Sequence, residues 1–545
     1  MQVSELIVRY LERLGIRQLF GIPGAHVLPI YDHLYHSSIH SILTKHEQGA
    51  SFMAGGVARV SGQVSACIAT AGPGATNLVT GIANAYADRL PVLAVTGEAP
   101  TSIFGKGGLQ ESSGEGGSIN QNTLFSAITR YHKLIRQTDE LLEVLTEATT
   151  ILLSDQPGPV VLSLPYNLQK EEVDATILDR ITFPPQGPLL PPPNRATNTF
   201  STLIQQAKKT VILAGHGAIH AGREINQLCE LFNIEVTTTL KGKGVISEYS
   251  PYFIGSLGVT SDGNAYRTIT EEADLLIILG ASFNERTSYL WSPELLQEKK
   301  LIQVDHNPAQ LEKVFSATLA IKAAVVPTLR AVLTQLQQPL SASPLPKPSL
   351  SPPPSESPIL RSTPPLIQQF FAQLERHFVD EPLSLFDDNI IYGQNLFRAS
   401  PSHHYLPNSG ISSLGHAIPA AIGASLLNQH PTFALLGDGG FQMCALELMT
   451  AVNYNIPINV VLLNNGAMGL IRKNQFQQYE GRYIDCDFIN PDFALLARAF
   501  GISHFKIDQE AELRTLFTHC DLYKGINLIE IPIDKNAFPD YQSGR

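Results

Sequence analysis

Short apolar runs alternate with helix-like segments along the chain, and this alternation constrains the fold more than any other feature. The clearest runs are Ser65–Ala69, Val92–Val95, Thr210–Leu213, Leu275–Leu279, Thr432–Leu436 and Ile458–Leu463. Strands interleaved with helices predict parallel sheets that are covered on both faces. We therefore expect the α/β class, with three doubly wound parallel-sheet domains whose ligands bind in loops beyond the carboxyl ends of the strands.

Two proline-rich stretches divide the chain. Residues 183–193 read FPPQGPLLPPP, and residues 339–365 are rich in proline and serine. Proline cannot continue a helix or an inner strand, so both stretches predict boundaries. The expected domains are 1–180, 195–338 and 366–545, with 339–365 as a Pro/Ser-rich linker, and each has an ordinary domain size.

Charge and cysteine content exclude several classes of protein. The 545 residues include 38 Lys and Arg against 49 Asp and Glu, and no dense basic run occurs, which disfavours binding to nucleic acid or an anionic membrane. The 5 cysteines are scattered without a CxxC pair, as in a protein with reduced thiols. The opening MQVSELIVRYLERLG has the pattern of an amphipathic helix, not of a signal peptide, and no apolar run is long enough to span a bilayer. We expect a cytoplasmic protein.

The last third of the chain carries two strand-to-loop motifs with oxygen ligands. They read FALLGDGGFQM (433–443) and INVVLLNNGAMGLI (458–471). Gly437, Gly439 and Gly440 allow the backbone to approach an anion. Asp438 supplies a carboxylate and Asn465 an amide oxygen, and Mg²⁺ prefers few such protein ligands, completed by phosphates and water. The pair of motifs predicts a magnesium–diphosphate site, although GDGG alone is equally typical of a tight turn.

The first third carries three complementary motifs. They read FGIPGAHVLPIYDHL (20–34), LTKHEQGASFMAGGVARVSG (43–62) and CIATAGPGATNLVTGIANAYADRLPVLAVTG (67–97). Each one joins a strand, a tight turn and a helix, and Glu47 lies where the second helix begins. A carboxylate at that place is also explained by the helix dipole alone.

Together with SGISSLGHAIPAAIGA (409–424) and ELMTAVNYNIPINVVLLNN (447–465), these motifs resemble the thiamine diphosphate-dependent 2-oxo acid decarboxylase and acetolactate synthase superfamily. The resemblance covers nearly the whole chain. It implies a pyrimidine-binding N-terminal domain, a central domain and a diphosphate-binding C-terminal domain. It assigns the metal to Asp438, Asn465 and the backbone carbonyl of Ala467. The implied cofactor contacts are Gly24, Ala25, Pro73, Asn77, Ser412, Leu414, Gly437, Gly439, Gly440, Asn465 and Met468.

Two of these positions have specific implied roles. Leu414 stands where acetolactate synthases have a methionine that holds the cofactor in a bent conformation, although ordinary core packing would explain a leucine equally well. The carbonyl of Ser412 would accept a hydrogen bond from the amino group of the cofactor.

The resemblance makes Glu47 the catalytic carboxyl beside the pyrimidine ring. Its proton favours the imino tautomer, whose nitrogen removes the proton of the thiazolium carbon. In the superfamily, the residue that matches Glu47 reaches a cofactor held by another subunit. A homodimer or homotetramer is therefore implied.

Two further catalytic candidates lie near the expected reacting carbons. Gln110 matches the glutamine of an FQE motif, here LQE, and is otherwise a surface-loop amide. His26 could sit over the cofactor as a proton donor, since imidazole titrates near neutrality, or could simply cap a turn. The tryptophan that shapes the acceptor pocket of acetolactate synthases is missing, and Asn474 stands near its position. Arg472 and Lys473 could receive a substrate carboxylate or could be solvated surface charges.

The middle third resembles the central domain of the superfamily. In TVILAGHGAIHAGREI (210–225) the glycine spacing does not match the dinucleotide-binding fingerprint. Some members of the superfamily bind FAD there, so FAD is an optional further cofactor. Asp305 ends a predicted strand and could meet a ribose hydroxyl, or be an ordinary loop carboxylate.

The sequence thus predicts a thiamine diphosphate- and Mg²⁺-dependent carboligase of acetolactate synthase type. It would decarboxylate a small 2-oxo acid and ligate the fragment to a second carbonyl compound. The alternative is a non-oxidative 2-oxo acid decarboxylase that releases an aldehyde. A flavin-dependent oxidase and a non-catalytic homologue are less favoured, the latter because Glu47, Asp438 and Asn465 are all present.

Overall fold

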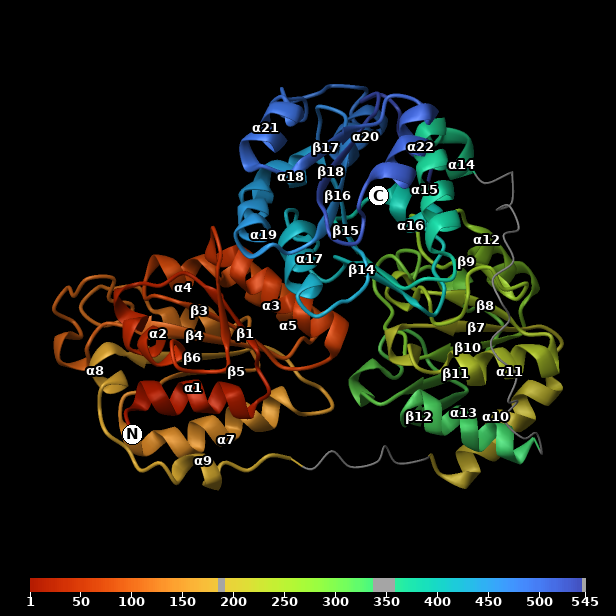
Figure 1. The fold of residues 1–545 in the computed structure, drawn as a ribbon. Coiled ribbons are helices and arrows are strands. Elements are labelled where there is room, and N and C mark those ends of the chain that lie inside the picture. The colour runs from red at the N-terminus through yellow and green to blue at the C-terminus, as the bar shows by residue number, and fades with distance from the viewer. Residues whose placement is uncertain (185–191, 337–357, 542–545) are drawn as a thin grey trace.

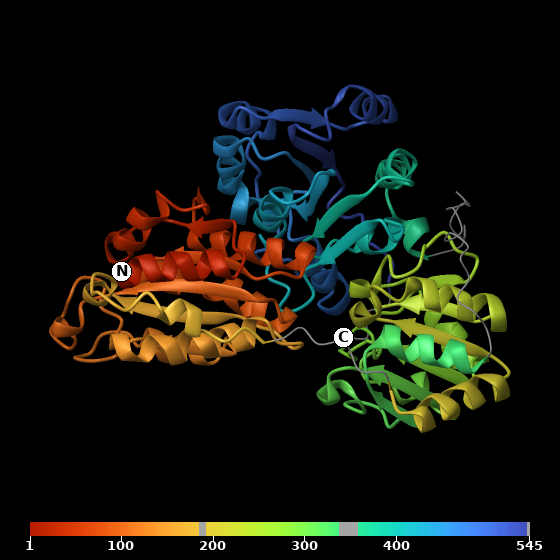
Figure 2. The same cartoon turned by 60° about the horizontal axis from the view of Figure 1, so that its bottom comes forward.

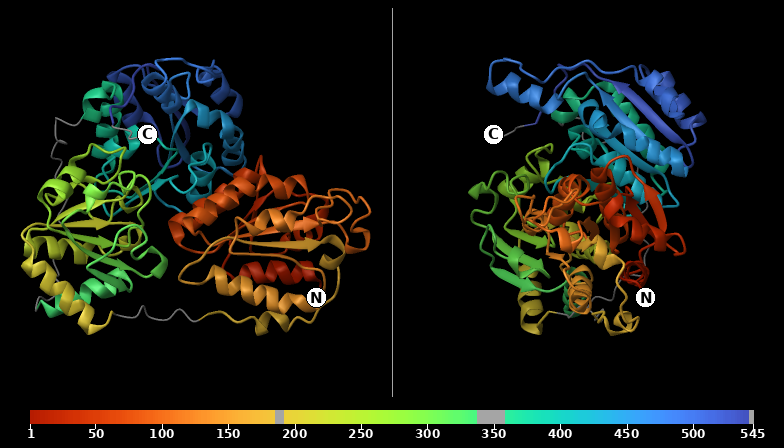
Figure 3. Two further views of the ribbon diagram at one scale, coloured as in Figure 1. Left: turned by 180° about the vertical axis from the view of Figure 1, so that it is seen from behind. Right: turned by 90° about the vertical axis from the view of Figure 1, so that its left-hand side faces the viewer.

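The computed structural model describes residues 1–184, 192–336 and 358–541. It contains three six-stranded sheets, and the pairings between their named strands are all parallel. Figure 1 shows one sheet in each of three lobes, and the same arrangement is seen from behind in Figure 3. The predicted α/β class with three doubly wound parallel sheets is confirmed.

The N-terminal lobe has the strand order β2-β1-β3-β4-β6-β5. Its central strands β3 and β4 are fully buried, as expected for apolar runs covered by helices on both faces (Figure 2). Its helices and strands are α1 (Val3–Arg13), β1 (Gln18–Gly21), α2 (Leu28–Leu34), β2 (His40–Leu43), α3 (Glu47–Ser61), β3 (Ser65–Ala69), α4 (Pro73–Asn77), α5 (Val79–Asp88), β4 (Val92–Glu98), α6 (Gln121–Ser126), β5 (Tyr131–Leu134), α7 (Leu141–Leu152), β6 (Val160–Pro165), α8 (Tyr166–Gln169) and α9 (Ile177–Arg180).

The central lobe has the strand order β12-β11-β10-β7-β8-β9. Counted within the lobe and from the other edge, this is 3-2-1-4-5-6, the order of nucleotide-binding doubly wound folds. Its elements are α10 (Asn194–Gln206), β7 (Thr210–Ala214), α11 (Gly222–Phe232), β8 (Glu235–Thr238), β9 (Phe253–Ser256), α12 (Asn264–Arg267), β10 (Leu275–Leu279), β11 (Lys300–Asp305), β12 (Leu319–Lys322) and α13 (Val325–Gln335).

The C-terminal lobe has the strand order β14-β13-β15-β16-β18-β17. Its elements are α14 (Pro358–Ser362), α15 (Pro365–Phe378), β13 (Leu383–Asp387), α16 (Ile391–Leu396), β14 (His403–Pro407), α17 (Ala417–Ser425), β15 (Thr432–Gly437), α18 (Asp438–Cys444), α19 (Leu448–Tyr454), β16 (Ile458–Asn464), α20 (Gly469–Gln478), α21 (Phe493–Phe500), β17 (Ser503–Lys506), α22 (Glu510–His519) and β18 (Ile526–Pro532).

The outer two lobes share one topology. Counted within each lobe, both sheets run 2-1-3-4-6-5, so the chain changes direction across the sheet between strands 1 and 3. Ligands of doubly wound sheets bind at the carboxyl ends of the strands beside such a switch point. We therefore expect ligand sites at the loops after β1 and β3 and at the loops after β13 and β15.

Helices α3 and α17 lie side by side and join the N-terminal and C-terminal lobes (Figure 1). Glycines allow their backbones to touch. A Cβ atom on Gly56 would lie 2.0 Å from the carbonyl oxygen of Ala420, and one on Gly423 would lie 2.1 Å from that of Met53. No larger residue fits at either position, so the two outer lobes are held in one fixed packing.

The predicted domain limits remain predictions. Most of the proline-rich stretch 183–193 and most of the linker 339–365 lie outside the described residues, and the end of the linker includes α14. Within the described part of the chain, no helix combines the length and the apolar character needed to cross a bilayer.

Candidate active site

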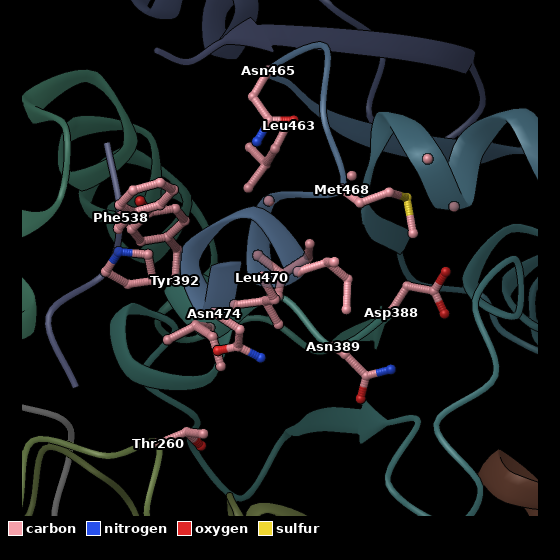
Figure 4. A pocket seen from close by; sticks show the side chains of 18 of the residues that line it. Thr260, Asp388, Asn389, Tyr392, Leu463, Asn465, Met468, Leu470, Asn474 and Phe538 are labelled. Carbon is pink, nitrogen blue, oxygen red and sulfur yellow. The ribbon is translucent and has the colours of Figure 1, made fainter. Parts of the chain in front are cut away.

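A cavity of about 490 Å³ lies between the C-terminal and central lobes, at the switch point of the C-terminal sheet. Figure 4 shows Met468, Asp388 and Asn389 on one side of it, Tyr392 and Phe538 on the other, and Thr260 of the central lobe below. All the C-terminal residues predicted to hold the cofactor or the metal line this one cavity. They are Ser412, Leu414, Gly437, Asp438, Gly439, Gly440, Asn465, Ala467 and Met468.

Asp438 is the buried anchor of this site. It is the first residue of α18 and directly follows β15. Its Oδ2 accepts from the backbone amides of Asn465 (3.1 Å) and Gly466 (2.6 Å) and from Nδ2 of Asn490 (2.7 Å). Burial raises the pKa of the carboxyl, and these hydrogen bonds oppose the rise. Nothing local in the sequence marks Asn490, which lies 52 residues further on.

The donor set suits a magnesium ion bound to a diphosphate. Among the described residues, Oδ1 of Asp438 accepts only from the amide of its neighbour Gly439 and keeps lone pairs for a cation. The amide of Asn465 and the loop of Ala467 line the same cavity. Hard oxygen donors in small number match the preference of Mg²⁺. The loop is also tightly packed, since a Cβ atom on Gly439 would lie 2.5 Å from Sδ of Met468. The described residues contain no cluster of three or more His, Cys, Asp or Glu side chains suited to a metal, and the predicted set has only one carboxylate.

A second buried carboxyl, Asp388, was not anticipated. It follows β13, and its Oδ2 accepts from the amide of Gly415 at 2.7 Å, which fixes the turn that carries Ser412 and Leu414. Burial, reinforced by the neighbouring charge of Asp387, raises the pKa of Asp388 to about 7. The sequence FDDN directly after an apolar strand was a signal of the same kind as GDGG, and could have revealed it.

The turn at 412–415 is conformationally unusual. Ser412 and Asn389 both have left-handed backbones, with φ of 54° and 65°. Nδ2 of Asn389 lies 3.4 Å from the carbonyl oxygen of Ser412, and both residues line the cavity. The carbonyl of Ser412 therefore faces a hydrogen-bond donor, the side-chain amide of Asn389. Leu414 is only half-buried and lines the cavity, which disfavours its interpretation as ordinary core.

The central lobe contributes an arginine that sequence analysis missed. Arg286 lines the cavity, and its Nη1 is buried without a hydrogen-bond partner among the described residues. A buried guanidinium nitrogen with no partner is costly unless a ligand completes it. Its position depends on how two lobes meet, and no sequence pattern reveals that.

The predicted N-terminal residues form a second cluster, at the switch point of their own sheet. Glu47 is 9 % exposed, and its Oε2 accepts from Nδ2 of Asn77 at 2.9 Å. A Cβ atom on Gly74 would lie 3.3 Å from Oε1 of Glu47 and 2.9 Å from Cγ2 of Thr70. Gly24 packs against Thr70 as well, whereas Ala25 and Pro73 are exposed at the rim.

His26 and Gln110 meet beside Thr70. Nδ1 of His26 lies 3.2 Å from Oε1 of Gln110, which also accepts from Thr70 Oγ1 at 3.3 Å. Burial lowers the pKa of His26, which favours the neutral ring, and the contact with Gln110 opposes this shift. With the amide oxygen of Gln110 facing the ring, the tautomer that donates from Nδ1 and keeps a lone pair on Nε2 satisfies this contact. The predicted role of His26 as a proton donor over the cofactor stays a prediction.

The two clusters do not share a cavity within one chain. None of Glu47, Asn77, His26 and Gln110 is among the residues that line the cavity around Asp438. The structure thus gathers the predicted residues into two halves, each at the carboxyl edge of its own sheet.

Comparisons with known proteins agree with these two halves. The models of thiamine pyrophosphate enzymes match residues 1–116 (N-terminal TPP binding domain), 198–335 (central domain) and 389–531 (C-terminal TPP binding domain). The chain is 32% identical to a probable acetolactate synthase large subunit of Methanocaldococcus jannaschii, over 98% of this chain and 92% of that protein. It is 30% identical to an acetolactate synthase of Arthrospira platensis, over 98% and 94%. It is 31% identical to the acetolactate synthase isozyme 1 large subunit of Escherichia coli, over 97% and 94%.

The chain belongs to the thiamine pyrophosphate enzyme family. The match runs through all three lobes, so the family membership rests on the whole chain and not on one motif.

Two basic residues near the cavity of this thiamine pyrophosphate enzyme are buried, not solvated. Arg472 pairs with Asp487 at 2.8 Å. Lys473 is 1 % exposed, donates to the carbonyl of Tyr541 at 3.2 Å and lies 3.1 Å from the centre of its ring. Burial lowers the pKa of Lys473 to about 8. The alternative that both are surface charges is therefore wrong, although neither lines the cavity, whereas Asn474 does.

Two central-lobe residues that were considered for a nucleotide site, Gly215 and Asp305, make contacts within the protein. A Cβ atom on Gly215 would lie 2.3 Å from the carbonyl oxygen of Gly280, so this glycine serves packing between two loops. Asp305 ends β11 and is buried, and its Oδ1 accepts from the amide of Asn307 at 2.8 Å. FAD stays a prediction for this lobe.

Proposed function

We propose that this protein is a thiamine diphosphate- and Mg²⁺-dependent carboligase of acetolactate synthase type. It decarboxylates a small 2-oxo acid and joins the remaining fragment to a second carbonyl compound. The observation that carries the proposal is that all nine C-terminal residues predicted to contact the cofactor or the metal line one cavity, in a chain similar to acetolactate synthases over 97–98% of its length.

In this proposal the C-terminal cavity holds the diphosphate end. Asp438, Asn465 and the carbonyl of Ala467 bind Mg²⁺, and the glycines at 437–440 let the backbone reach the diphosphate. Leu414 and Met468 contact the body of the cofactor. When bound there, thiamine diphosphate would supply a nucleophilic carbon and an electron sink for the decarboxylation of a 2-oxo acid.

The N-terminal cluster holds the pyrimidine end and the proton. Glu47 carries the proton beside the pyrimidine ring, and the hydrogen bond from Asn77 fixes its carboxyl. His26, kept in one tautomer by Gln110, offers Nε2 as a proton acceptor near the reacting atoms. Arg286 lines the cavity and receives the carboxylate of the 2-oxo acid, since its buried Nη1 lacks a hydrogen-bond partner among the described residues.

The two halves come together in a homodimer, so that Glu47 of one subunit serves the cavity around Asp438 of the other. A homotetramer built from two such dimers is equally compatible. The separation of the clusters within one chain supports this assignment. Regulation by a further subunit is outside the proposal. The expected compartment is the cytosol, consistent with five free cysteines.

The test is to identify the product. The purified protein, loaded with thiamine diphosphate and Mg²⁺, is incubated with pyruvate and with longer 2-oxo acids, alone and in pairs. We expect a 2-hydroxy-3-oxo acid, detected by mass spectrometry together with released carbon dioxide. The absence of carbon dioxide from every 2-oxo acid would contradict the proposal.

A second candidate is a 2-oxo acid decarboxylase that releases an aldehyde. It is favoured by Asn474, which lines the cavity near the position at which acetolactate synthases were expected to place a tryptophan that shapes the acceptor pocket. A smaller polar side chain leaves the acceptor less confined. An aldehyde as the main product in the same incubation would select this candidate. A yellow, flavin-containing protein would instead point to a role for FAD.

A further inference from the structure

Glu447 of the C-terminal lobe binds the backbone immediately before Glu47 of the N-terminal lobe. Its Oε1 accepts from the amide of His46 at 2.9 Å and from that of Lys45 at 3.1 Å, and its Oε2 lies 3.2 Å from the amide of Lys45. The side chain is 3 % exposed, and the hydroxyl of Thr450 donates to Oε2 at 2.8 Å. A buried carboxylate with charge-assisted hydrogen bonds of this kind fixes the groups that it binds.

A tyrosine from the same helical stretch extends this contact. The hydroxyl of Tyr454, the last residue of α19, lies 2.8 Å from the amide of Leu43. The amide of Thr44, in between, donates to Gly21 within the N-terminal lobe. Three of the four amides of residues 43–46 are therefore held by side chains of the C-terminal lobe.

The N-terminal lobe has room for the carboxylate of Glu447 because residue 49 is a glycine. A Cβ atom on Gly49, in the first turn of α3, would lie 2.1 Å from Oε1 of Glu447. Only a glycine leaves room there for the carboxylate. The position of Glu47 at the start of α3 thus depends on a carboxylate from another lobe.

We propose that Glu447 is a positioning residue for Glu47: by clamping the amides of Lys45 and His46, it sets where the catalytic carboxyl meets the pyrimidine ring. This inference rests on the proposed function, which gives Glu47 its role.

Glu447 lies on the same helical stretch as Asp438. Residues 438–454 form one nearly continuous helical stretch, from α18 through a short 3₁₀ turn (Ala445–Glu447) to α19. Asp438 begins this stretch in the cavity, and Glu447 and Tyr454 hold the loop of Glu47. In the proposed dimer, one stretch therefore touches the metal of one active site and the proton-carrying loop of the other.

The test measures exchange of the thiazolium carbon proton for deuterium in the holoenzyme, by quenched flow and proton NMR. This step reports the action of Glu47 without any substrate. We expect Glu447→Gln to slow it about 10- to 100-fold, because small misplacements of catalytic groups have effects of that size. The dissociation constant of thiamine diphosphate should stay unchanged, since Glu447 does not line the cavity. Tyr454→Phe should slow exchange about 2- to 10-fold through loss of one hydrogen bond.

A matched control separates positioning from general destabilisation. Glu248 is also a buried glutamate, 6 % exposed, that accepts from a backbone amide, that of Ala399 at 3.0 Å, where the central and C-terminal lobes meet. Glu248→Gln should leave the exchange rate at the wild-type value. If Glu447→Gln does not fold, Tyr454→Phe provides the same test.

The outcomes separate the two proposals. Slow exchange in Glu47→Gln with normal exchange in Glu447→Gln and Tyr454→Phe would overturn the positioning role alone. Normal exchange in Glu47→Gln would overturn the role of Glu47, and the positioning role with it. Slowing of equal size in Glu248→Gln would also reject positioning, since it would show a general effect of destabilisation.

Discussion

The imidazole of His416 lies in the core beside α17 with both ring nitrogens unpartnered among the described residues. It is 1 % exposed and makes an edge contact with the ring of Phe52, 5.2 Å between centroids. Burial lowers its pKa to about 3 from an ordinary value of 6.5. The folded protein thus excludes a proton that the unfolded chain binds.

This contrast predicts a pH-dependent loss of stability. Between pH 6.5 and about 3 the unfolded state binds one more proton at His416 than the folded state does, so acid favours unfolding. We expect the free energy of unfolding of wild type, relative to that of His416→Leu, to fall by about 1.4 kcal/mol per pH unit in this window. Above pH 6.5 the difference should be constant. Urea unfolding of both proteins at several pH values measures it, and a difference independent of pH would contradict the assignment.

Substitutions of Glu47 and of Asp438 should impair the enzyme in different ways, the first in turnover and the second in cofactor binding. Glu47→Gln removes the proton carrier but no contact to the diphosphate, so turnover should fall at least about 100-fold with the cofactor still bound. Asp438→Ala removes a metal ligand, so the dissociation constant for thiamine diphosphate with Mg²⁺ should rise at least about tenfold. Isothermal titration and steady-state rates distinguish the two. Loss of cofactor binding in Glu47→Gln would count against the division of roles.

Much of the candidate site could be predicted because its residues follow strands directly. Asp438, Asn465 and Glu47 each lie shortly after a strand, beside glycines that are visible in the sequence. Arg286, Asn490 and Glu447 could not be found that way. Glu447 binds amides of another lobe, Asn490 binds a carboxyl 52 residues away, and Arg286 lines a cavity between two lobes, so their roles depend on packing that no local pattern encodes.

At the scale of elements, inner strands were far easier to locate than edge strands. β3, β10 and β16 are buried on both faces and read as continuous apolar runs. The strands β5 and β17, with sequences YHKL and SHFK, lie at sheet edges and are half-exposed. Only pairing with a neighbour makes such short polar segments into strands.

The close contact between α3 and α17 predicts that two neighbouring glycines of α3 differ in their tolerance of a methyl group. Gly56→Ala should lower the free energy of unfolding by about 1–3 kcal/mol or more, because the new methyl group would overlap the carbonyl of Ala420. Gly55→Ala, one residue earlier, is the matched control. Its Cβ atom would have no neighbour closer than 3.7 Å, so it should be neutral or stabilising by about 0.5–1 kcal/mol. Equal effects in chemical denaturation would refute this packing.

At the scale of the whole molecule, shared active sites can be tested by mixing subunits. Neither Glu47→Gln nor Asp438→Ala should be active alone. If Glu47 serves the partner's cavity, a hybrid dimer has one intact site. Random mixing makes half of the dimers hybrids with one of two sites intact, so about a quarter of wild-type activity should return. Activity that stays at background in co-expressed, doubly tagged hybrids would place Glu47 and Asp438 in the same chain's site.

The backbone contact between α3 and α17 also bears on how the chain is made. Its two sides, α3 (Glu47–Ser61) and α17 (Ala417–Ser425), are separated in the sequence by the whole central lobe. During synthesis, the N-terminal lobe emerges from the ribosome long before the C-terminal lobe. Until α17 has been made, the flat, glycine-lined face of α3 stays uncovered. We therefore expect nascent chains that stop before α17 to depend on chaperones and to aggregate when released.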